Sequence, residues 1–583
     1  MNTYKKIRAI LTPKERKKMF FLFFLMFIGM WLETLGVGIL FPVMVIMGQK
    51  DLTIRYPIVA PVVAYLGNPT QNQLIVGVLL VLVGIFFIKN LFLAFIAWRQ
   101  VRYSSGIQTN LAQRLFSTYL RLPYTFHLQR NSAQLAHNIG EVNVFTSVIG
   151  SSMTMLTESL AFLGIVVLLL MAEPLGVMIL IIVLGVAVWS FHSVTRSRIT
   201  RWGEARQHHD ALRGKHMYQG LGGVKDVKLL GREKTFLAQF QLHSSQGARV
   251  AGSQAILQQL PRLWLELLAV TGLALLVMSM LGQGFSTERI VPTLGLFAAA
   301  AFRLLPSVNR MIAGIQLLRY QLPSVNLMYE EARQTIVEPD LILESDNTTN
   351  YFFKNEICLS NISYIYPGAS AQSIDDVSII ISKGETVGFI GPSGSGKSTM
   401  VDIILGLLPP ADGKVLVDGD DIQKNLRVWQ NQIGYVPQAI YLTDDTLRHN
   451  VAFGLPNEEI DDVAVQRAIK DAQLEEFVAG LPNGLETIVG ERGIRLSGGQ
   501  RQRIGIARAL YHDPAVLVLD EATSALDTST EQGVMRAVTA LHGSKTILIV
   551  AHRLSTVEHC DRLYRLEQGK VVAKGTPKEM LVP

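Results

Sequence analysis

Six long apolar runs, separated by short polar or basic stretches, constrain this chain more than any other feature of its sequence. The hydrocarbon core of a bilayer is about 30 Å thick, so a helix needs about 20 apolar residues to cross it. Runs of suitable length lie at residues 19–47, 74–98, 147–171, 176–194, 263–281 and 290–305. The pattern therefore predicts an all-α domain that spans a membrane six times.

The chain is too long for a single domain, because one hydrophobic core stops growing at about 250–300 residues and this chain has 583. Beyond residue 335, strand-like and helix-like segments alternate with ordinary charge, as in a soluble α/β domain. Hydrophobic residues make up 49% of the sequence and the mean hydropathy is +0.29, which suits a chain that is half membrane-embedded. We expect a transmembrane domain over residues 1–335, a linker over 336–350 and an α/β domain over 351–583.

The net charge of +7 has a distribution that favours a membrane over a nucleic-acid partner. Lysines and arginines gather at the N-terminus and in the two long loops that follow the second and fourth apolar runs. The positive-inside rule then places these loops, both termini and the α/β domain in the cytoplasm, and predicts no nucleic-acid partner. The two cysteines, Cys358 and Cys560, indicate no disulfide framework and a reducing compartment.

The two long loops keep helical periodicity without strong helix breakers, so we expect them to continue the spanning helices deep into the cytoplasm. One outer segment, residues 55–69, is apolar but interrupted by prolines and too short to span. A packed loop and a helix lying in the membrane interface both remain open for it.

The clearest motif of the second domain is "GPSGSGKST" at residues 391–399, between a strand-like segment and a helix-like one. Strand, glycine-rich loop and helix form the context of a P-loop, in which backbone N–H groups close around phosphate oxygens. Lys397 is placed to reach the β- and γ-phosphates, and Ser398 to ligate Mg²⁺.

A second motif, "AVLVLDE", ends an apolar strand with two acids. Asp520 suits the Mg²⁺ shell, and Glu521 suits a residue that orients or deprotonates the attacking water. Adjacent acids after a strand are otherwise typical of a solvated turn, but the P-loop in the same domain favours the nucleotide site.

Between these motifs lies "LSGGQRQRIGIARAL", residues 496–510, which resembles the signature of the ATP-binding cassette (ABC) family. The resemblance covers residues 351–583 and implies an ABC nucleotide-binding domain that uses ATP and Mg²⁺. It implies a catalytic set of Glu521, His552 and Gln438, and a metal set of Ser398, Gln438 and Asp520. The implied nucleotide-binding residues are Tyr366, Gly391, Ser393, Gly394, Ser395, Gly396, Lys397, Ser398, Thr399, Ser497, Gly498, Gly499, Gln500 and Asp527.

The signature also implies a dimer. Ser497 and the glycines after it open a helix, and so form a second anion site that one subunit cannot aim at its own P-loop. In the family, two cassettes pack head to tail with ATP between them. Only one cassette is encoded here, so we expect a homodimer with two competent sites.

Six spans fused ahead of one cassette resemble the half-transporter exporters of this superfamily. Residues 119–135 and 221–233 look like their two coupling elements, which carry cassette closure to the membrane helices.

Four cations stand at unusual places in the spans: Lys89 and Arg303 about 20 Å from the outer end of their helices, and Arg262 and Arg310 at the cytoplasmic rim. A buried charge in a membrane helix costs about 2.5–3.5 kcal/mol or more, so such residues indicate function by default. Snorkelling to the headgroups remains open for Arg262 and Arg310. Ion pairing with carboxylates of the spans, namely Glu33, Glu158 and Glu266, also remains open.

The stretches "PRLWLE" and "FRLLPSVNR" resemble one exporter branch, the bacterial flippases of lipid-linked oligosaccharides. In that branch, arginines in a central cavity are thought to engage the pyrophosphate of a polyprenyl carrier. Arg262, Arg303 and Arg310 match those positions. Lys89 stands where the branch has arginine, which keeps the charge but loses the bidentate fork.

These observations predict ATP-driven flipping of an anionic lipid-linked oligosaccharide across a bacterial inner membrane. A broad lipid or multidrug exporter is the alternative within transport, and a nucleotide-gated channel or regulator is the alternative from another class. An accessory subunit of a heterodimer would usually have a degenerate Walker B or signature motif, and both are intact here.

Overall fold

The computed structural model of the chain describes residues 3–39, 43, 71–172, 174–284, 287–337, 353–490, 493–522, 528–551 and 553–581. The fold divides into two compact units. The membrane unit comprises Met1–Leu122 and Arg130–Ile342, and the nucleotide unit comprises Pro123–Gln129 and Leu343–Pro583. Most of the predicted linker and the outer segment at 55–69 lie outside the described residues.

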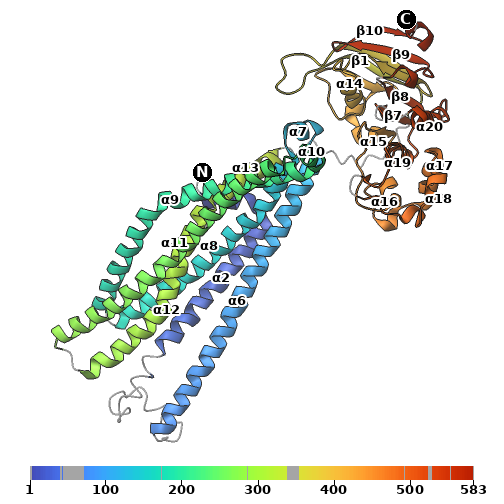
Figure 1. The fold of residues 1–583 in the computed structure, drawn as a ribbon. Helices are drawn as coiled ribbons and strands as arrows, with labels where there is room; N and C mark the ends of the chain where they lie inside the picture. Colours follow the sequence, from blue (N-terminus) through green and yellow to red (C-terminus); the bar gives the residue numbers. More distant parts are fainter. Residues whose placement is uncertain are drawn as a thin grey trace. The chain divides into compact units, whose positions relative to one another are not determined.

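The membrane unit is built from long helices that run side by side (Figure 1). Five of its described helices are long and apolar enough to cross a membrane: α2, α6, α8, α11 and α12. The remaining predicted span falls within α9, which is not among these five. The described helices of the unit are α1 (Thr3–Ile10), α2 (Pro13–Gly38), α6 (Gln71–Arg121), α8 (Ser132–Ala172), α9 (Pro174–Gly222), α10 (Val224–Leu229), α11 (Glu233–Gly282), α12 (Thr287–Tyr320) and α13 (Leu322–Val337).

The predicted cytoplasmic extensions are confirmed as parts of the spanning helices. Helix α6 has 51 residues and α9 has 49. At 1.5 Å per residue these helices are about 75 Å long, more than twice the thickness of the hydrocarbon core. The excess length is basic and polar, and in α6 its interior face packs around Phe145, which is fully buried.

One close approach joins α9 to the end of α12. Gly203 lies directly against Tyr320, and a Cβ at Gly203 would clash with the Tyr320 carbonyl group. The two helices therefore touch backbone to backbone, which small residues at helix interfaces permit.

The nucleotide unit contains two sheets. A six-stranded sheet has the order β10-β9-β3-β8-β7-β6, with parallel pairing from β9 through β6 and an antiparallel β10 at its edge. A four-stranded antiparallel sheet has the order β2-β1-β4-β5. The strands are β1 (Glu356–Tyr364), β2 (Ile374–Ser382), β3 (Thr386–Ile390), β4 (Asp412–Val417), β5 (Asp420–Asp421), β6 (Ile433–Val436), β7 (Val516–Asp520), β8 (Thr546–Val550), β9 (Arg562–Glu567) and β10 (Lys570–Gly575).

The central parallel strands β3, β7 and β8 are buried on both faces, which explains why they read as continuous apolar runs such as "TVGFI" and "TILIV". Helices cover the sheet and complete the cores. In a sheet of this kind, ligands bind beyond the carboxyl ends of the strands, where β3 and β7 deliver the two nucleotide motifs. The helices are α7 (Tyr124–Gln129), α14 (Lys397–Ile404), α15 (Leu426–Gln430), α16 (Leu447–Val451), α17 (Asp462–Asp471), α18 (Glu475–Ala479), α19 (Gly498–Leu510), α20 (Thr528–Thr539) and α21 (Pro577–Met580).

Candidate functional site

The P-loop has the predicted context: strand β3 ends at Ile390, the glycine-rich loop follows, and helix α14 begins at Lys397. Two glycines have backbone angles that other residues rarely adopt, with φ of +149° at Gly391 and +102° at Gly396. A Cβ at Gly391 would clash with the carbonyl oxygen of Leu566, and one at Gly396 would lie 2.6 Å from that of Ser373. The loop can therefore close this tightly only with glycine at both positions.

Lys397 folds back over the loop that precedes it. Its Nζ donates to the carbonyl oxygens of Gly391 and Pro392, both at 2.9 Å. Burial lowers the pKa of Lys397, while the carboxylates of Glu521 and Asp520 act in the opposite direction. The ammonium group is thus held at the loop by neutral carbonyls, in position to meet an anion there.

Asp520 ends strand β7 opposite the P-loop. Ser398 Oγ and Tyr435 OH donate to its two carboxylate oxygens, each at 3.4 Å. Burial, and secondly the charge of Glu521, raise the pKa of Asp520. Tyr435 was not among the predicted site residues, because a tyrosine in a short strand carries no sequence signal of such a contact.

Glu521 follows Asp520 with a positive φ of 50°, an uncommon conformation for a side-chain-bearing residue. Gln438 Nε2 donates to Glu521 Oε2 at 2.6 Å, so the structure brings these two predicted catalytic residues together. The other two predicted residues of this region, His552 and Asp527, lie outside the described residues.

The residues at this edge fit a nucleoside triphosphate and Mg²⁺. Ser395 Oγ is buried in the P-loop without a hydrogen-bond partner among the described residues, as expected of a group that waits for a ligand. The hydroxyl of Ser398, the carboxylate of Asp520 and the amide oxygen of Gln438 are the hard oxygen donors that Mg²⁺ prefers. The side chains of Ser393 and Ser398 are exposed, as is the backbone of Gly394.

Around the predicted adenine position, Tyr366 OH lies 3.1 Å from Thr399 Oγ1, and its ring packs edge-on against Tyr364. The short helix α7 groups with the nucleotide unit, although its residues come from the loop after the second span. Burial raises the pKa of Tyr124 in α7, with Asp402 and Tyr366 as further causes. The predicted first coupling element thus includes a helix whose tyrosine is close to the nucleotide motif.

The signature begins helix α19, with Ser497 as its N-cap. Ser497 Oγ accepts from the N–H of Gln500 at 3.2 Å, and the Gln500 side chain accepts from the N–H of Ser497 at 2.8 Å. This reciprocal capping box fixes the first turn. The N–H groups of Gly498 and Gly499 lie in that turn and have no carbonyl partner within the helix, so they are available to an anion.

In the membrane unit, Arg303 of α12 is held by carboxylates from two other helices. Its Nε donates to Glu33 of α2, and its Nη1 lies 3.3 Å from Glu158 of α8. Ser307, one turn along α12, accepts from Arg303 at 2.7 Å and donates to Glu158 at 2.6 Å. Ion pairing, which the sequence left open, therefore describes the present state of Arg303.

Glu158 is shared between two arginines, because its second oxygen lies 2.7 Å from Nε of Arg310. Arg310 keeps 47% of its side-chain surface exposed, against 21% for Arg303. Lys89 is buried against Gly36, with its Nζ 4.4 Å from the centre of the Phe86 ring and within electrostatic range of Glu33 and Arg303. The structure thus brings three of the four predicted cations together.

Arg262 is placed differently. It pairs with Glu266 at 2.9 Å on its own helix α11, and 74% of its side chain is exposed. Among the contacts of the described residues, none joins Arg262 to the three other cations.

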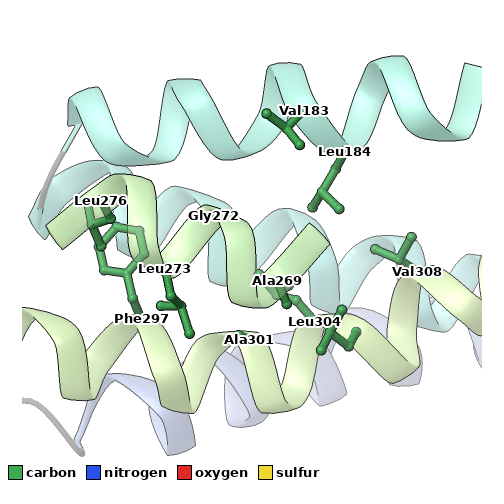
Figure 2. Close-up of a pocket in the computed structure, with 11 residues that line it drawn as sticks. Val183, Leu184, Ala269, Gly272, Leu273, Leu276, Phe297, Ala301, Leu304 and Val308 are labelled. Atoms are coloured by element: carbon green, nitrogen blue, oxygen red, sulfur yellow. The ribbon is translucent and has the colours of Figure 1, made fainter. Parts of the chain in front are cut away.

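Helix α12 has an apolar face as well as a charged one. Leu304 and Val308, which follow Arg303 and Ser307 in sequence, line a cavity of about 40 Å³ between α9, α11 and α12 (Figure 2). Its lining is apolar throughout, with small residues at Ala269, Gly272 and Ala301. The charged face of α12 meets α2 and α8, and the apolar face meets α9 and α11.

Two family models match the chain. The ABC transporter transmembrane region matches residues 18–279, and the ABC transporter domain matches residues 374–524. The matched ranges contain four of the six predicted spans in full, nearly all of a fifth, and most of the nucleotide motifs.

Similar proteins include two relatives named ATP-dependent lipid A-core flippase. The one from Cupriavidus metallidurans is 30% identical over 507 residues, which cover 86% of this chain and 84% of the relative. The one from Albidiferax ferrireducens is 32% identical over 515 residues, which cover 86% of each chain.

Among solved structures, a bacterial Atm1-family ABC exporter with ATP bound has the same fold. It superposes with a TM-score of 0.78 at 24% identity, over 97% of this chain and 96% of that one. Together with the P-loop, the capped signature helix and the long membrane helices, these matches show that the chain belongs to the ABC transporter family, as an exporter half-transporter whose ATPase domain is fused to its transmembrane domain.

Proposed function

We propose that this protein is a homodimeric flippase that moves a lipid-linked oligosaccharide across a bacterial inner membrane. The cargo would be an oligosaccharide on a polyprenyl-pyrophosphate carrier, moved from the cytoplasmic to the outer leaflet. The observation that carries the proposal is the cluster of Lys89, Arg303 and Arg310 among the membrane helices.

The ion pairs of this cluster leave a positive charge. Three cations (Lys89, Arg303, Arg310) face two carboxylates (Glu33, Glu158), so the formal charge is 3 − 2 = +1. Burying an unbalanced charge is costly in a membrane unless it serves a ligand or a pathway. An anionic headgroup would complete the balance, and arginine is suited to bind phosphate oxygens in pairs.

The exposure of the two arginines suggests an order of events. Arg310 is about half exposed, so an incoming diphosphate meets it first and competes with Glu158 for its guanidinium. Release of Glu158 then loosens its contacts with Arg303 and Ser307. Cargo binding would in this way be coupled to the packing of α8 against α12.

The nucleotide unit supplies the driving force. Ser398, Asp520 and Gln438 would hold Mg²⁺, which supplies charge neutralisation at the transferred phosphoryl group. Lys397 and the P-loop N–H groups bind the phosphates, and Glu521 orients or deprotonates the attacking water, with His552 as its partner in the reaction. The capped signature helix of the second subunit closes the site, because one chain carries only one signature.

A second candidate cargo is lipid A-core, which the names of the relatives favour. A broad exporter of amphiphiles has less support, since three cations that converge in a membrane unit select for an anion. The proposal is therefore tested with both lipids in the same preparation.

The test uses the full-length protein in proteoliposomes, with a fluorescent polyprenyl-diphosphate oligosaccharide or labelled lipid A-core, and follows ATP-dependent loss of accessibility at one leaflet. Arg303→Ala and Arg310→Ala should each reduce flipping at least about tenfold while ATP hydrolysis stays within about threefold. Glu158→Gln, which removes the carboxylate that competes with the cargo for both arginines, should instead lower the cargo concentration needed for half-maximal flipping.

Arg249→Ala, on the exposed cytoplasmic part of α11, serves as a matched control and should leave flipping unchanged. Equal losses in Arg303→Ala and Glu158→Gln would show that the pairs are only structural. Transport of lipid A-core in place of the oligosaccharide would keep the flippase and replace the cargo.

A further inference from the structure

Arg508, near the end of the signature helix α19, is a partly buried cation with an unusual environment. It donates to the carbonyl oxygens of Tyr441 and Asn450, each at 2.8 Å, and to Asn450 Oδ1 at 3.2 Å. The Phe453 ring lies 4.4 Å from the guanidinium. No carboxylate is among these described contacts, and burial lowers the pKa of Arg508 to about 10. A guanidinium partly buried against neutral oxygens, with no carboxylate among these contacts, is costly, so its position needs a reason.

The carbonyl of Tyr441 belongs to the loop that begins at Gln438. This loop also packs at two more points, one on α19 and one just before it. Ile440 packs on Gly505, where a Cβ would clash with the Ile440 side chain. Leu442 packs on Gly493, just before the helix, where a Cβ would lie 2.6 Å from Leu442 Cδ1. Gly505 and Arg508 are one turn apart on the same face of the helix, so the loop lies along that face.

Asn450 lies in helix α16, which follows the loop, and its contact with Arg508 ties this helix to α19 as well. Its side chain is fully buried and accepts from the backbone N–H of Thr443 at 3.0 Å, while its Nδ2 donates to the Thr443 and Thr446 carbonyls. Arg508 thus joins α19 to both ends of the segment 441–450.

The start of the same loop is chemically important. Gln438, three residues before Tyr441, donates to Glu521 at 2.6 Å. Three residues of extended chain reach at most about 10 Å, so a displacement of the Tyr441 carbonyl is passed to the Gln438 amide with little slack.

We propose that Arg508 is a positioning residue that makes the Gln438 loop move with the signature helix. Engagement of the signature by a nucleotide at one end of α19 then sets the Gln438–Glu521 contact through the other end. The inference rests on the role of Gln438 and Glu521 in ATP hydrolysis given in the proposed function, but it does not depend on the identity of the cargo.

The first test is the ATPase activity of the full-length protein in proteoliposomes. Arg508→Lys keeps the charge but cannot reach three acceptors, so kcat should fall about tenfold while KM for ATP changes less than about twofold. Arg467→Lys is the matched control, because Arg467 donates to the carbonyl oxygen of Tyr511 and, among the described residues, makes no hydrogen bond to the loop. It should keep kcat within about twofold.

Gly505→Ala provides a variant that leaves the arginine intact, and the preference of a helix for alanine over glycine offsets part of the cost of displacing Ile440. Its methyl group pushes Ile440 away from α19, so kcat should again fall several-fold at unchanged KM. Wild-type turnover in both Arg508→Lys and Gly505→Ala would overturn the inference.

A double-mutant cycle with Gln438→Ala tests whether Arg508 acts through Gln438. If Arg508 acts through Gln438, the double variant should turn over no more slowly than Gln438→Ala alone. Additive losses would overturn the inference while keeping Gln438 in its role. Wild-type turnover by Gln438→Ala alone would remove that role, and the inference with it.

Discussion

The two units place their charges by different means. In the nucleotide unit, the cationic and acidic groups are set by local motifs: a glycine-rich turn fixes Lys397, and a strand end fixes Asp520 and Glu521. In the membrane unit, Arg303 is fixed by partners 270 and 145 residues away along the chain. A charged group that a local motif fixes can be recognised from the sequence, and its position tolerates changes elsewhere in the fold. A charged group that distant residues fix depends on how the helices pack. Four predictions test this contrast.

The largest effect should come from a local catalytic group. Glu521→Gln keeps the shape of the side chain and its contact with Gln438 but removes the base, so ATP turnover should fall about 10²–10⁴-fold. Phosphate release measures the turnover, and size-exclusion chromatography with ATP should detect accumulated ATP-bound dimers. Glu458→Gln, at an exposed position, is the control. Normal hydrolysis by Glu521→Gln would take this residue out of the mechanism.

The next effect concerns the membrane unit. Glu33→Gln leaves Arg303 with a single carboxylate, and breaking a buried pair by removing one partner costs about 3–5 kcal/mol. Thermal unfolding of the detergent-solubilised protein should therefore show a lower Tm. Glu33→Leu combined with Arg303→Met should recover part of the loss, because it removes both charges. The contrast between the units breaks down if Glu33→Gln is as stable as the wild type.

A smaller effect should follow from the helix cap of the signature. Ser497→Ala removes the side-chain half of the capping box and should cost about 1 kcal/mol of stability. Ser497→Thr should restore most of it, since threonine also caps helices. Hydrogen exchange of the first turn of α19 measures the fraying directly, and unchanged protection in the alanine variant would contradict the role of the cap.

The last effect is a pH dependence. Burial raises the pKa of Asp402 from 3.8 to about 6, with Asp520 as a second cause. The folded state thus binds this proton more tightly than the unfolded state, so the contribution of Asp402 to stability is lost as pH rises from about 4 to 6. Asp402→Asn should raise Tm at pH 7.5 relative to the wild type, and the difference should vanish near pH 4. A constant difference between these pH values would contradict the raised pKa.

The same contrast explains what could be read from the sequence. The fold class, the strand–loop–helix context of Lys397 and the helix that opens at Ser497 depend on residues within a few positions of each other, and the structure agrees with them. The helical extensions also follow from local periodicity. In each of these cases, the residues that determine the structure lie within the same short segment of the chain.

The contacts that escaped prediction are all tertiary. Glu33 and Glu158 were recognised as possible partners of the arginines, but only the packing of α2 and α8 against α12 assigns them to Arg303 and Arg310. Tyr435 beside Asp520 and Arg508 on the Gln438 loop carry no periodicity or spacing that marks them. Contacts of this kind can be identified only when the packing of elements distant in the sequence is known.

The backbone contact of Gly203 with Tyr320 has a mechanical consequence for the membrane unit. With no side chain between the two helices, neither can slide past the other without an immediate steric collision, while tilting about the point of touch stays cheap. We therefore expect α9 and the end of α12 to pivot about this contact, rather than slide past each other, when the membrane helices rearrange.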